Sequence, residues 1–423
     1  NITVNESFAD YSQTLWFEYS QGKDAGAFEN YTGLRNYLSS PSDAEKNLVR
    51  FYYKDKEDVF DLVSYQKGGR ILNMLRHLVG DDAFFASLNK YLTDNKFSNG
   101  SAIKLKLAFE AVTGKDLNWF FNQWYFGSGH PYVRIGQKYM ADQQKVLVTI
   151  QQTQTQNKLF TLPIGIDVYV NGNRNHYEVW SKNKVDSFYF PAAVAPDNVN
   201  VDNDKVLLWA KDESKPIEQY AYQMKHARNF MDRFEAANEA ATNLKNPAAK
   251  TIIEAAIKDT FHVIRSIALN SYNPTAIDAA MEAQVIQIAS SDKVSTVRED
   301  AINVLSKINK PGFTALYEKW VNDSSYTVAG AALAALEIVD SAKAFTIAKQ
   351  FSTQPLKKRL NAVVTTILTK YGDGQVFDFV ATTYGKLNIQ SSEKFEMTMP
   401  FAQLLIKTTD PVKFKKGIDL IVE

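Results

Sequence analysis

An internal repeat in the last third of the sequence limits the folds open to this chain. Residues 294–308, VSTVREDAINVLSKI, align with residues 324–339, SSYTVAGAALAALEIV, at an offset of 31 residues. The matching positions are Val297 with Val328, Ala301 with Ala332, Leu305 with Leu336, and Ile308 with Val339. A helical pair of this kind buries its apolar face only against the next pair. The repeat therefore predicts stacked helices, and residues 264 and 268 are consistent with an earlier copy.

The hydrophobic period changes twice along the chain, which predicts three domains. Residues 1–130 carry mostly helical spacing. Residues 131–211 instead hold short β-branched or aromatic segments separated by turn signals, and these segments are VLVTIQQ, LPIGIDVYV, HYEVW and SFYF. Such spacing is typical of a small antiparallel β-sandwich. Residues 212–423 return to helical spacing, and their repeat resembles HEAT-type pairs, in which a small alanine lets neighbouring helices approach closely.

Start and stop signals place individual helices within residues 1–130. A helix over Leu62 to Val79 is predicted to end at Gly80, because glycine adopts the positive φ that terminates a helix. Another helix is expected to begin at Asp81. Ser101 is expected to cap a third helix that ends at Gly114, and a fourth, rich in tryptophan and phenylalanine, is expected over residues 116–127. The aromatic residues of that fourth helix are interpreted as core.

Charge and residue counts argue against several classes of protein. With 48 Lys and Arg against 47 Asp and Glu, the chain has no electrostatic footprint for nucleic acid or an anionic membrane. Its most apolar stretch, residues 328–339, is too short to span a bilayer. No cysteine is present, which excludes disulfides and cysteine catalysis but does not identify a compartment, so cytoplasm and periplasm both remain open.

The histidines offer no zinc site of their own. The five are His77, His130, His176, His226 and His262, and no two lie three to five positions apart. A helix therefore cannot present the histidine pair at i and i+4 that zinc binding on one face requires. No nucleophile elbow, P-loop or dinucleotide fingerprint appears either. Taken by itself, the sequence carries no complete active site.

Two adjacent glycines interrupt the helical pattern that ends at Gly80. Gly68 and Gly69 each cost a helix about 1 kcal/mol relative to alanine. A cost of this size suggests that another group approaches the backbone there. On a helix, Tyr65 shares a face with one of these glycines and Leu72, so the tyrosine is expected to project over bare backbone.

The segment NESFA at residues 5–9, followed by Tyr11 and Trp16, resembles a motif of the M1 family of zinc aminopeptidases. The family motif is N-E-G-F-A, and its glutamate completes a zinc site begun by H-E-x-x-H. The resemblance implies that Glu6 is the third ligand of one catalytic Zn²⁺, with both histidines upstream of this sequence. Ser7 departs from the family's glycine, but it follows the ligand and leaves the metal-binding residue in place.

The segment SYQKGGR at residues 64–70 is similar to the family's Y-x-K-G motif. In the family, this tyrosine donates a hydrogen bond to the oxyanion that forms when zinc-bound water attacks the scissile carbonyl. The resemblance implies this catalytic role for Tyr65. The role agrees with general chemistry, because a neutral donor aimed at developing charge stabilises the transition state more than the substrate.

Further matches to the family run through Val112-Thr113-Gly114, residues 121–124 and Gly129-His130-Pro131. The resemblance implies a multidomain, mainly α fold with a small β-sandwich. Residues 1–130 would be the helical C-terminal part of a thermolysin-like catalytic domain, residues 131–211 the β-sandwich, and residues 212–423 a HEAT-like solenoid. The N-terminal half of the catalytic domain, including H-E-x-x-H and a G-x-M-E-N-type segment for the substrate amine, would lie upstream.

The implied function is removal of N-terminal residues from peptides by the full-length enzyme. The chain alone is expected to be inactive, because one carboxylate is not a zinc site. The main alternative is a non-catalytic scaffold that retains the helical array, and an epoxide-hydrolysing relative is a weaker one. Residue preference at the substrate N-terminus and oligomeric state are not encoded in any motif found.

Other polar residues of these motifs receive ordinary structural interpretations. Lys67 and Arg70 are expected to be surface charges or ion-pair partners. His130, beside Pro131, is expected to be a turn residue. None of the three is assigned a role in the chemistry.

Overall fold

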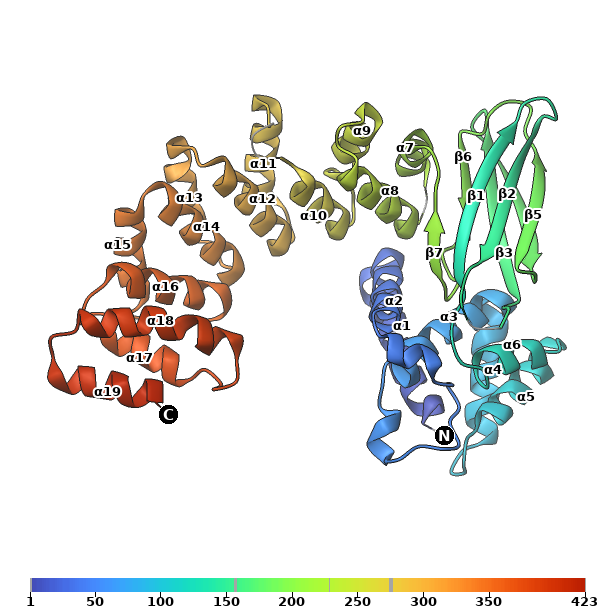
Figure 1. Ribbon diagram of the computed structural model, residues 1–423, viewed down its shortest axis with the longest axis horizontal. Helices are drawn as coiled ribbons and strands as arrows, with labels where there is room; N and C mark the ends of the chain where they lie inside the picture. The colour runs from blue at the N-terminus through green and yellow to red at the C-terminus, as the bar shows by residue number, and fades with distance from the viewer. Residues whose placement is uncertain (1, 156–157, 228, 274–276, 423) are drawn as a thin grey trace. The chain divides into compact units, whose positions relative to one another are not determined.

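The structure is a computed structural model that describes residues 2–155, 158–227, 229–273 and 277–422. The chain divides into two compact units, Asn1–Ala255 (unit 1) and Ala256–Glu423 (unit 2), coloured blue to yellow-green and yellow to red in Figure 1. The division falls at the end of a helix rather than at either of the two predicted domain boundaries, and the three-domain scheme stays a prediction. Within the described residues, no helix combines the length and apolarity that a bilayer crossing needs.

Unit 1 begins with helices, as the sequence predicts. They are α1 (Thr3–Gln21), α2 (Lys23–Leu38), the 3-10 turns η1 (Pro41–Glu45) and η2 (Lys56–Val59), the π-helical turn η3 (Val63–Lys67), α3 (Gly68–Val79), α4 (Asp81–Asp94), α5 (Ala102–Thr113) and α6 (Asn118–Trp124). The predicted helix ends at Gly80 and Gly114 and the predicted helix start at Ser101 are confirmed. Gly80 has φ 87° and Gly114 has φ 66°, while the Ser101 hydroxyl accepts a hydrogen bond from the Lys104 N–H at 3.2 Å.

The sandwich contains two sheets. Its strands are β1 (Tyr132–Met140), β2 (Lys145–Gln152), β3 (Leu162–Val170), β4 (Asn173–Ser181), β5 (Val185–Pro191), β6 (Asn198–Val201) and β7 (Ala210–Glu213). One sheet has the order β5-β2-β1-β7 and the other β4-β3-β6. The four predicted segments correspond to β2, β3, β4 and β5. The sheets are not wholly antiparallel, because β7 pairs in parallel with β1.

Alternating residues of both sheets face a shared interior. Val148 of β2 and Ile166 of β3 are fully buried, and they belong to the same hydrophobic cluster as Phe121 and Trp124 of α6. The aromatic residues of α6 are therefore core, as predicted. The cluster extends from the helices into the sandwich, so these two parts of unit 1 share one interior.

Three helices complete unit 1, namely α7 (Ile217–His226), α8 (Phe230–Thr242) and α9 (Pro247–Ala256). Helix α8 returns to the first helices of the chain and packs on α2. The Phe28 and Phe230 rings meet edge to face with centroids 5.8 Å apart, and the Tyr31 and Phe234 rings do so at 5.0 Å. These contacts place segments that are 202 and 203 residues apart in sequence side by side.

Unit 2 is helical throughout its described residues. Its elements are α10 (His262–Ser271), α11 (Ala279–Ser291), α12 (Ser295–Ile308), the 3-10 turn η5 (Pro311–Phe313), α13 (Thr314–Trp320), α14 (Tyr326–Val339), α15 (Ser341–Phe351), α16 (Lys358–Tyr371), α17 (Phe377–Gly385), α18 (Ser392–Ile406) and α19 (Pro411–Val422). Every second helix packs on the next, in the series α10, α12, α14, α16 and α18 (Figure 1).

The repeat found in the sequence lies on α12 and α14. Ala301 and Ala332 are both fully buried, and so are Leu305 and Leu336. On α14, a Cβ at Gly330 would lie 2.8 Å from the backbone of residues 359 and 360 on α16. Small residues therefore let α14 and α16 approach closely, which is the packing that the alanines of the repeat predict.

Candidate functional site

Helix α1 lies directly on the backbone at the start of α3. A Cβ at Gly68 would stand 1.8 Å from the Ser7 hydroxyl oxygen, and a Cβ at Gly69 would stand 2.1 Å from a carboxylate oxygen of Asp10. The Ser7 hydroxyl also donates a hydrogen bond to the Ser64 carbonyl at 2.7 Å. The predicted close approach at the glycine pair is confirmed, but the approaching groups are side chains of α1 rather than Tyr65.

The predicted helix over residues 62–79 starts with a π-helical turn, η3. Its defining hydrogen bond runs from the Lys67 N–H to the Leu62 carbonyl at 2.9 Å, five residues back. Such a turn widens the helix and re-aims the side chains on it, and π-turns occur frequently at functional sites. No residue pattern in the sequence distinguishes this turn from an ordinary helical one.

The two residues that the sequence assigns to the site are brought together by this crossing. The pKa of the Tyr65 hydroxyl is raised above its ordinary value, chiefly by its hydrogen bond with Glu6, and by burial and the Glu6 charge. Both side chains are half-buried. At neutral pH, Tyr65 is thus a protonated phenol beside a carboxylate. The proximity does not test the roles of metal ligand and oxyanion donor, which stay predictions.

A second carboxylate lies one helical turn after Glu6. Burial, and secondarily the charge of Glu29 on α2, raises the pKa of Asp10 to about 6. Glu29 itself accepts a hydrogen bond from Gln13 at 2.6 Å. The face of α1 that carries Glu6 is therefore acidic. Sequence reasoning missed Asp10, although its spacing of i+4 from Glu6 is readable.

The interpretation of Lys67 and Arg70 as surface charges or ion-pair partners is wrong, whereas His130, expected to be a turn residue, does lie in the irregular segment between α6 and β1 but is buried. Lys67 is fully buried, Arg70 is 6 % exposed and His130 is 2 % exposed. The Arg70 guanidinium donates to the Asn30 side chain and to the carbonyls of residues 205 and 207, at 2.5 and 3.1 Å for the carbonyls. These hydrogen bonds link α3 to α2 and to the segment between β6 and β7. The error arose because charged residues are seldom buried, a rule that fails where the backbone supplies acceptors.

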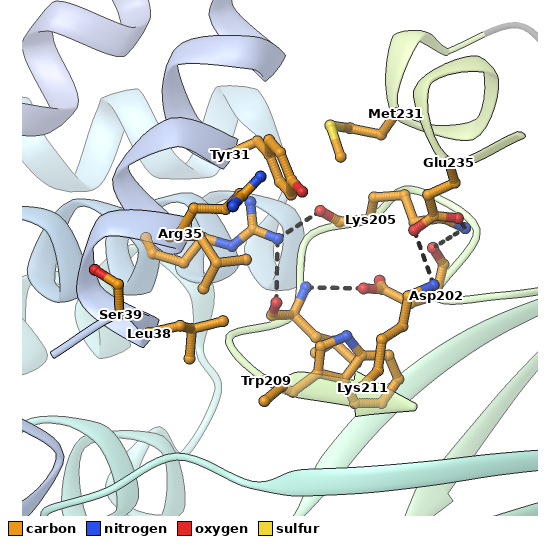
Figure 2. Close-up of a pocket in the computed structure, with 14 residues that line it drawn as sticks. Tyr31, Arg35, Leu38, Ser39, Asp202, Lys205, Trp209, Lys211, Met231 and Glu235 are labelled. Carbon is orange, nitrogen blue, oxygen red and sulfur yellow. Dashed lines mark hydrogen bonds and ion pairs between the residues drawn. The ribbon is translucent and has the colours of Figure 1, made fainter. Parts of the chain in front are cut away.

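A cavity of about 520 Å³ lies between α2, the segment before β7, and α8, and neither Glu6 nor Tyr65 lines it. Figure 2 shows Tyr31 and Arg35 on one side and Lys205, Lys211 and Glu235 on the other. Most of its charges are compensated internally. The Lys205 ammonium lies 2.9 Å from an Asp232 carboxylate oxygen, and the Lys211 ammonium lies 2.8 Å from a Glu235 carboxylate oxygen.

This ion network holds the parts of unit 1 together. Lys211 also pairs with Glu213 at 2.8 Å, and the two Lys211 partners raise its pKa well above the usual value although burial acts against them. The sequence signal for the network is the run KDESK at residues 211–215, which follows a wholly apolar stretch. We interpret the network as structural, because its charged groups are paired with one another.

The donors that this chain offers to zinc are limited. Within the described ranges, no group of three His, Cys, Asp or Glu side chains is placed to hold a metal ion. Glu6, with its half-exposed carboxylate and adjacent phenol donor, is suited to be one ligand of a zinc ion but not a whole site.

Residues 1–124 match the family described as "Peptidase family M1 domain". A protein named Tricorn protease-interacting factor F2 from Thermoplasma acidophilum is 28% identical over 153 residues, which are 34% of this chain and 19% of that protein. Probable aminopeptidase 1 from Sulfurisphaera tokodaii is 29% identical over 140 residues, which are 32% of this chain and 18% of that protein. The matched region thus spans less than a fifth of either relative.

Similarity in fold extends over the whole chain. Aminopeptidase A from Legionella pneumophila, whose crystal structure is in complex with aspartic acid, is similar with a TM-score of 0.59 and 14% sequence identity. The similarity covers 100% of this chain and 51% of that one. It shows a mainly helical fold with small sheets in common.

Proposed function

We propose, from the match of residues 1–124 to the peptidase family M1 domain, that the chain is part of a zinc-dependent aminopeptidase that removes N-terminal residues from peptides. The chain spans about half of its similar structure and less of its curated relatives, so the activity is proposed for the whole enzyme. The observation that supports the proposal is the crossing of α1 over η3, where the Ser7 hydroxyl donates to the Ser64 carbonyl at 2.7 Å and so brings the neighbouring residues Glu6 and Tyr65 together.

In the proposed reaction, Glu6 is a metal ligand and Tyr65 is the oxyanion donor. Zinc, when held by Glu6 and by histidines outside this sequence, would supply Lewis acidity. A tyrosine with an ordinary pKa of about 10 already keeps its proton at neutral pH, and Glu6 raises the pKa of Tyr65 further, so the phenol can act as a hydrogen-bond donor. As the substrate carbonyl becomes tetrahedral, negative charge grows on its oxygen, and this donor stabilises it.

Ser7 and Gly68 set the distance between these two groups. Their contact lies one residue after Glu6 and three residues after Tyr65, so it fixes the spacing of the two segments at the site. Any side chain larger than glycine at position 68 would push α1 away from η3. The substitution of serine for the family's glycine at position 7 is accommodated by its hydrogen bond to Ser64.

The decisive experiment is Tyr65→Phe in a protein that also carries the upstream histidines. We expect kcat to fall by about 10²–10³, as for loss of one oxyanion donor, with KM little changed. Tyr19→Phe is the control, because Tyr19 lies on α1 and is 85 % exposed. A Phe variant with unchanged kcat would remove Tyr65 from the mechanism.

The chain by itself is proposed to be inactive. We expect neither stoichiometric zinc nor peptide turnover from the 423-residue chain, because Glu6 alone cannot hold the metal. Zinc binding with turnover in this chain would contradict the proposal. If the upstream sequence lacks H-E-x-x-H, the alternative of a non-catalytic scaffold replaces the enzyme.

We also propose that the helices after the sandwich form a HEAT-like solenoid, within a three-part arrangement of residues 1–130, 131–211 and 212–423. The alternate packing of α10, α12, α14, α16 and α18 supports the solenoid. Limited proteolysis tests the arrangement, with cleavage expected near residues 131 and 212 if the three parts are separate domains.

A further inference from the structure

The cavity between α2, the segment before β7, and α8 has walls suited to an organic molecule. Its volume of about 520 Å³ lies within the range of roughly 300–1,000 Å³ that is usual for small-molecule sites. The phenol ring of Tyr31 and the indole of Trp209 form part of the lining (Figure 2). Apolar side chains complete it, and these are Leu34, Leu38, Leu207 and Met231. A ligand in this cavity would therefore bury an aromatic or aliphatic body.

The acids of the lining are occupied by groups of the protein itself. The described lining holds two of them, Asp202 and Glu235. The Asp202 carboxylate accepts hydrogen bonds from two backbone N–H groups, each at 3.1 Å. The Glu235 carboxylate lies 2.8 Å from the Lys211 ammonium and 3.6 Å from the Lys205 ammonium. Neither acid is free to bind the ammonium group of a ligand.

Three of the four cations in the described lining are occupied as well. Lys205 and Lys211 pair with carboxylates of the ion network. The Arg70 guanidinium donates to the Asn30 side chain and to two carbonyl oxygens, and the negative charge of Asp202 acts on it. These contacts hold the three cations in place within unit 1.

Arg35 is the fourth cation, and it lacks a carboxylate partner. Among the described residues, no acid lies within ion-pair distance of its guanidinium, which interacts with the Tyr31 hydroxyl one helical turn earlier. The side chain is exposed, and Figure 2 shows it beside Tyr31 on the α2 side of the cavity. A guanidinium binds a carboxylate through two parallel N–H donors. The cavity thus offers a free group for an anion but none for a cation.

We propose that this cavity binds an organic carboxylate with an aromatic or aliphatic body and no ammonium group. The carboxylate would pair with Arg35 on the exposed side, and the body would contact Tyr31, Trp209 and the apolar residues. A free amino acid fits less well, because its ammonium group would find Lys205 and Lys211 nearby and no free acid. Neither Glu6 nor Tyr65 lines this cavity, so the inference goes beyond the proposed function and does not depend on it.

The first test titrates the 423-residue chain with 3-phenylpropionate at constant ionic strength, followed by ligand-observed NMR. Three probes share its ring: 3-phenylpropionamide is neutral, 3-phenylpropylamine is a cation, and phenylalanine adds an ammonium group to the carboxylate. We expect saturable binding of 3-phenylpropionate with a Kd of about 1–10 mM, as for a fragment of this size. Each of the other three should bind at least about tenfold more weakly, because each lacks the anion or adds a cation.

Two substitutions at exposed positions test the role of Arg35. Arg35→Gln removes the charge and should raise the Kd for 3-phenylpropionate at least about tenfold. Ser39→Glu leaves Arg35 in place but supplies a carboxylate one helical turn later, so it should compete with the ligand and also raise the Kd. The matched control is Arg134→Gln, because Arg134 lies on β1, has a side chain that is 64 % exposed and does not line the cavity.

Hydrogen exchange of the chain with and without 3-phenylpropionate tests the location. Protection is expected on α2 and on residues 205–211, and no change is expected on α14 in unit 2. Urea midpoints of the three variants should equal that of the wild type, which shows that a raised Kd does not reflect unfolding.

Four results would overturn the inference. They are the absence of saturable binding, binding of the amine or amide as tight as that of the carboxylate, a Kd that neither Arg35→Gln nor Ser39→Glu changes, and protection confined to other segments. None of these measurements needs zinc or turnover. An inactive whole enzyme would therefore leave the carboxylate site standing, and a chain that binds no carboxylate would leave the proposed peptidase untouched.

Discussion

The two units of this chain treat buried polar groups differently. Unit 1 buries 21 polar or charged side chains among its described residues, including Lys67, Arg70, Lys205 and Asp232, while unit 2 buries three, all threonines. Those three are Thr365, Thr369 and Thr408, and each hydroxyl donates to the carbonyl four residues earlier in the chain. The difference teaches that unit 1 is specified by polar contacts between distant segments, whereas unit 2 is specified by small apolar residues at helix crossings.

The largest expected effect comes from breaking a buried charge pair in unit 1. Asp232→Ala leaves Glu235, at 3.6 Å, as the carboxylate paired with the Lys205 ammonium, beside its hydrogen bonds to neutral acceptors, and we expect unit 1 to lose about 3–5 kcal/mol of unfolding free energy. The matched change in unit 2 is Asp378→Ala, which removes a pair with Lys413 whose acid is 68 % exposed and should cost less than about 1 kcal/mol. Urea unfolding followed by hydrogen exchange and mass spectrometry measures each unit. Equal losses of unfolding free energy in the two variants would contradict the contrast between the units.

The next effect concerns the helix crossings of unit 2. Gly330→Ala places a methyl group against the α16 backbone, and we expect a loss of about 1–3 kcal/mol in unit 2. Gly312→Ala is the control, since a Cβ there meets nothing within 4 Å. Hydrogen exchange on α14 and α16 is the measurement. If both alanines are equally tolerated, close packing at Gly330 does not stabilise unit 2.

A smaller effect is expected from the acidic face of α1. The folded pKa of Asp10 is about 6 against 3.8 for the ordinary group, so its ionisation weakens unit 1 as pH rises from about 4 to 6. Asp10→Asn should match wild type below pH 4 and be more stable by about 1–3 kcal/mol above pH 6, at ~1.4 kcal/mol per pKa unit. Asp142→Asn, at an exposed position, should show no such pH dependence. A difference for Asp10→Asn that is independent of pH would contradict the assignment.

The smallest effect is expected at a buried threonine of unit 2. Thr369→Val removes a hydroxyl whose only described acceptor, the Thr365 carbonyl, lies in the same helix. Because the donor and the acceptor of this hydrogen bond lie in the same helix, the substitution should change the unfolding free energy of unit 2 by less than about 1 kcal/mol. A loss above about 2 kcal/mol in urea unfolding would mean that unit 2 also depends on buried polar contacts.

The contrast between the units also explains what could be predicted. Apolar periodicity predicted α12 and α14 and the small residues on them. The contacts of such a repeat are made by residues close together in sequence, so the pattern can be recognised there. Glycine and serine signals predicted the ends of α3 and α5 for the same reason. The close approach at Gly68 and Gly69 was predictable, since glycine in a helix requires a cause, but its partners on α1 lie about 60 residues away.

What the sequence did not predict depends on contacts between distant segments. Arg70 is buried because it donates to carbonyls 135 and 137 residues later in the chain, and no local sequence pattern predicts these hydrogen bonds. The π-helical register of η3 and the burial of Lys67 depend on packing against α2 and on the loops around it. The strands β1, β6 and β7 were missed because β6 and β7 have four residues each and β1 buries only Val133 and Ile135, too few for a clear alternating pattern. The resemblance to a family supplied the roles of Glu6 and Tyr65, and their proximity agrees with those roles without testing them.

The first strand of the sandwich, β1, pairs with its last strand, β7, so the chain enters and leaves the sandwich side by side. Val133 pairs with Lys211, so the residues between them form a closed excursion whose ends are held by one ladder. The helices α2 and α8, on either side of the excursion, touch directly through Tyr31 and Phe234. Because the sandwich shares its interior with the helices, the part of it that can change length without disturbing them is an exposed hairpin tip such as Asn171-Gly172.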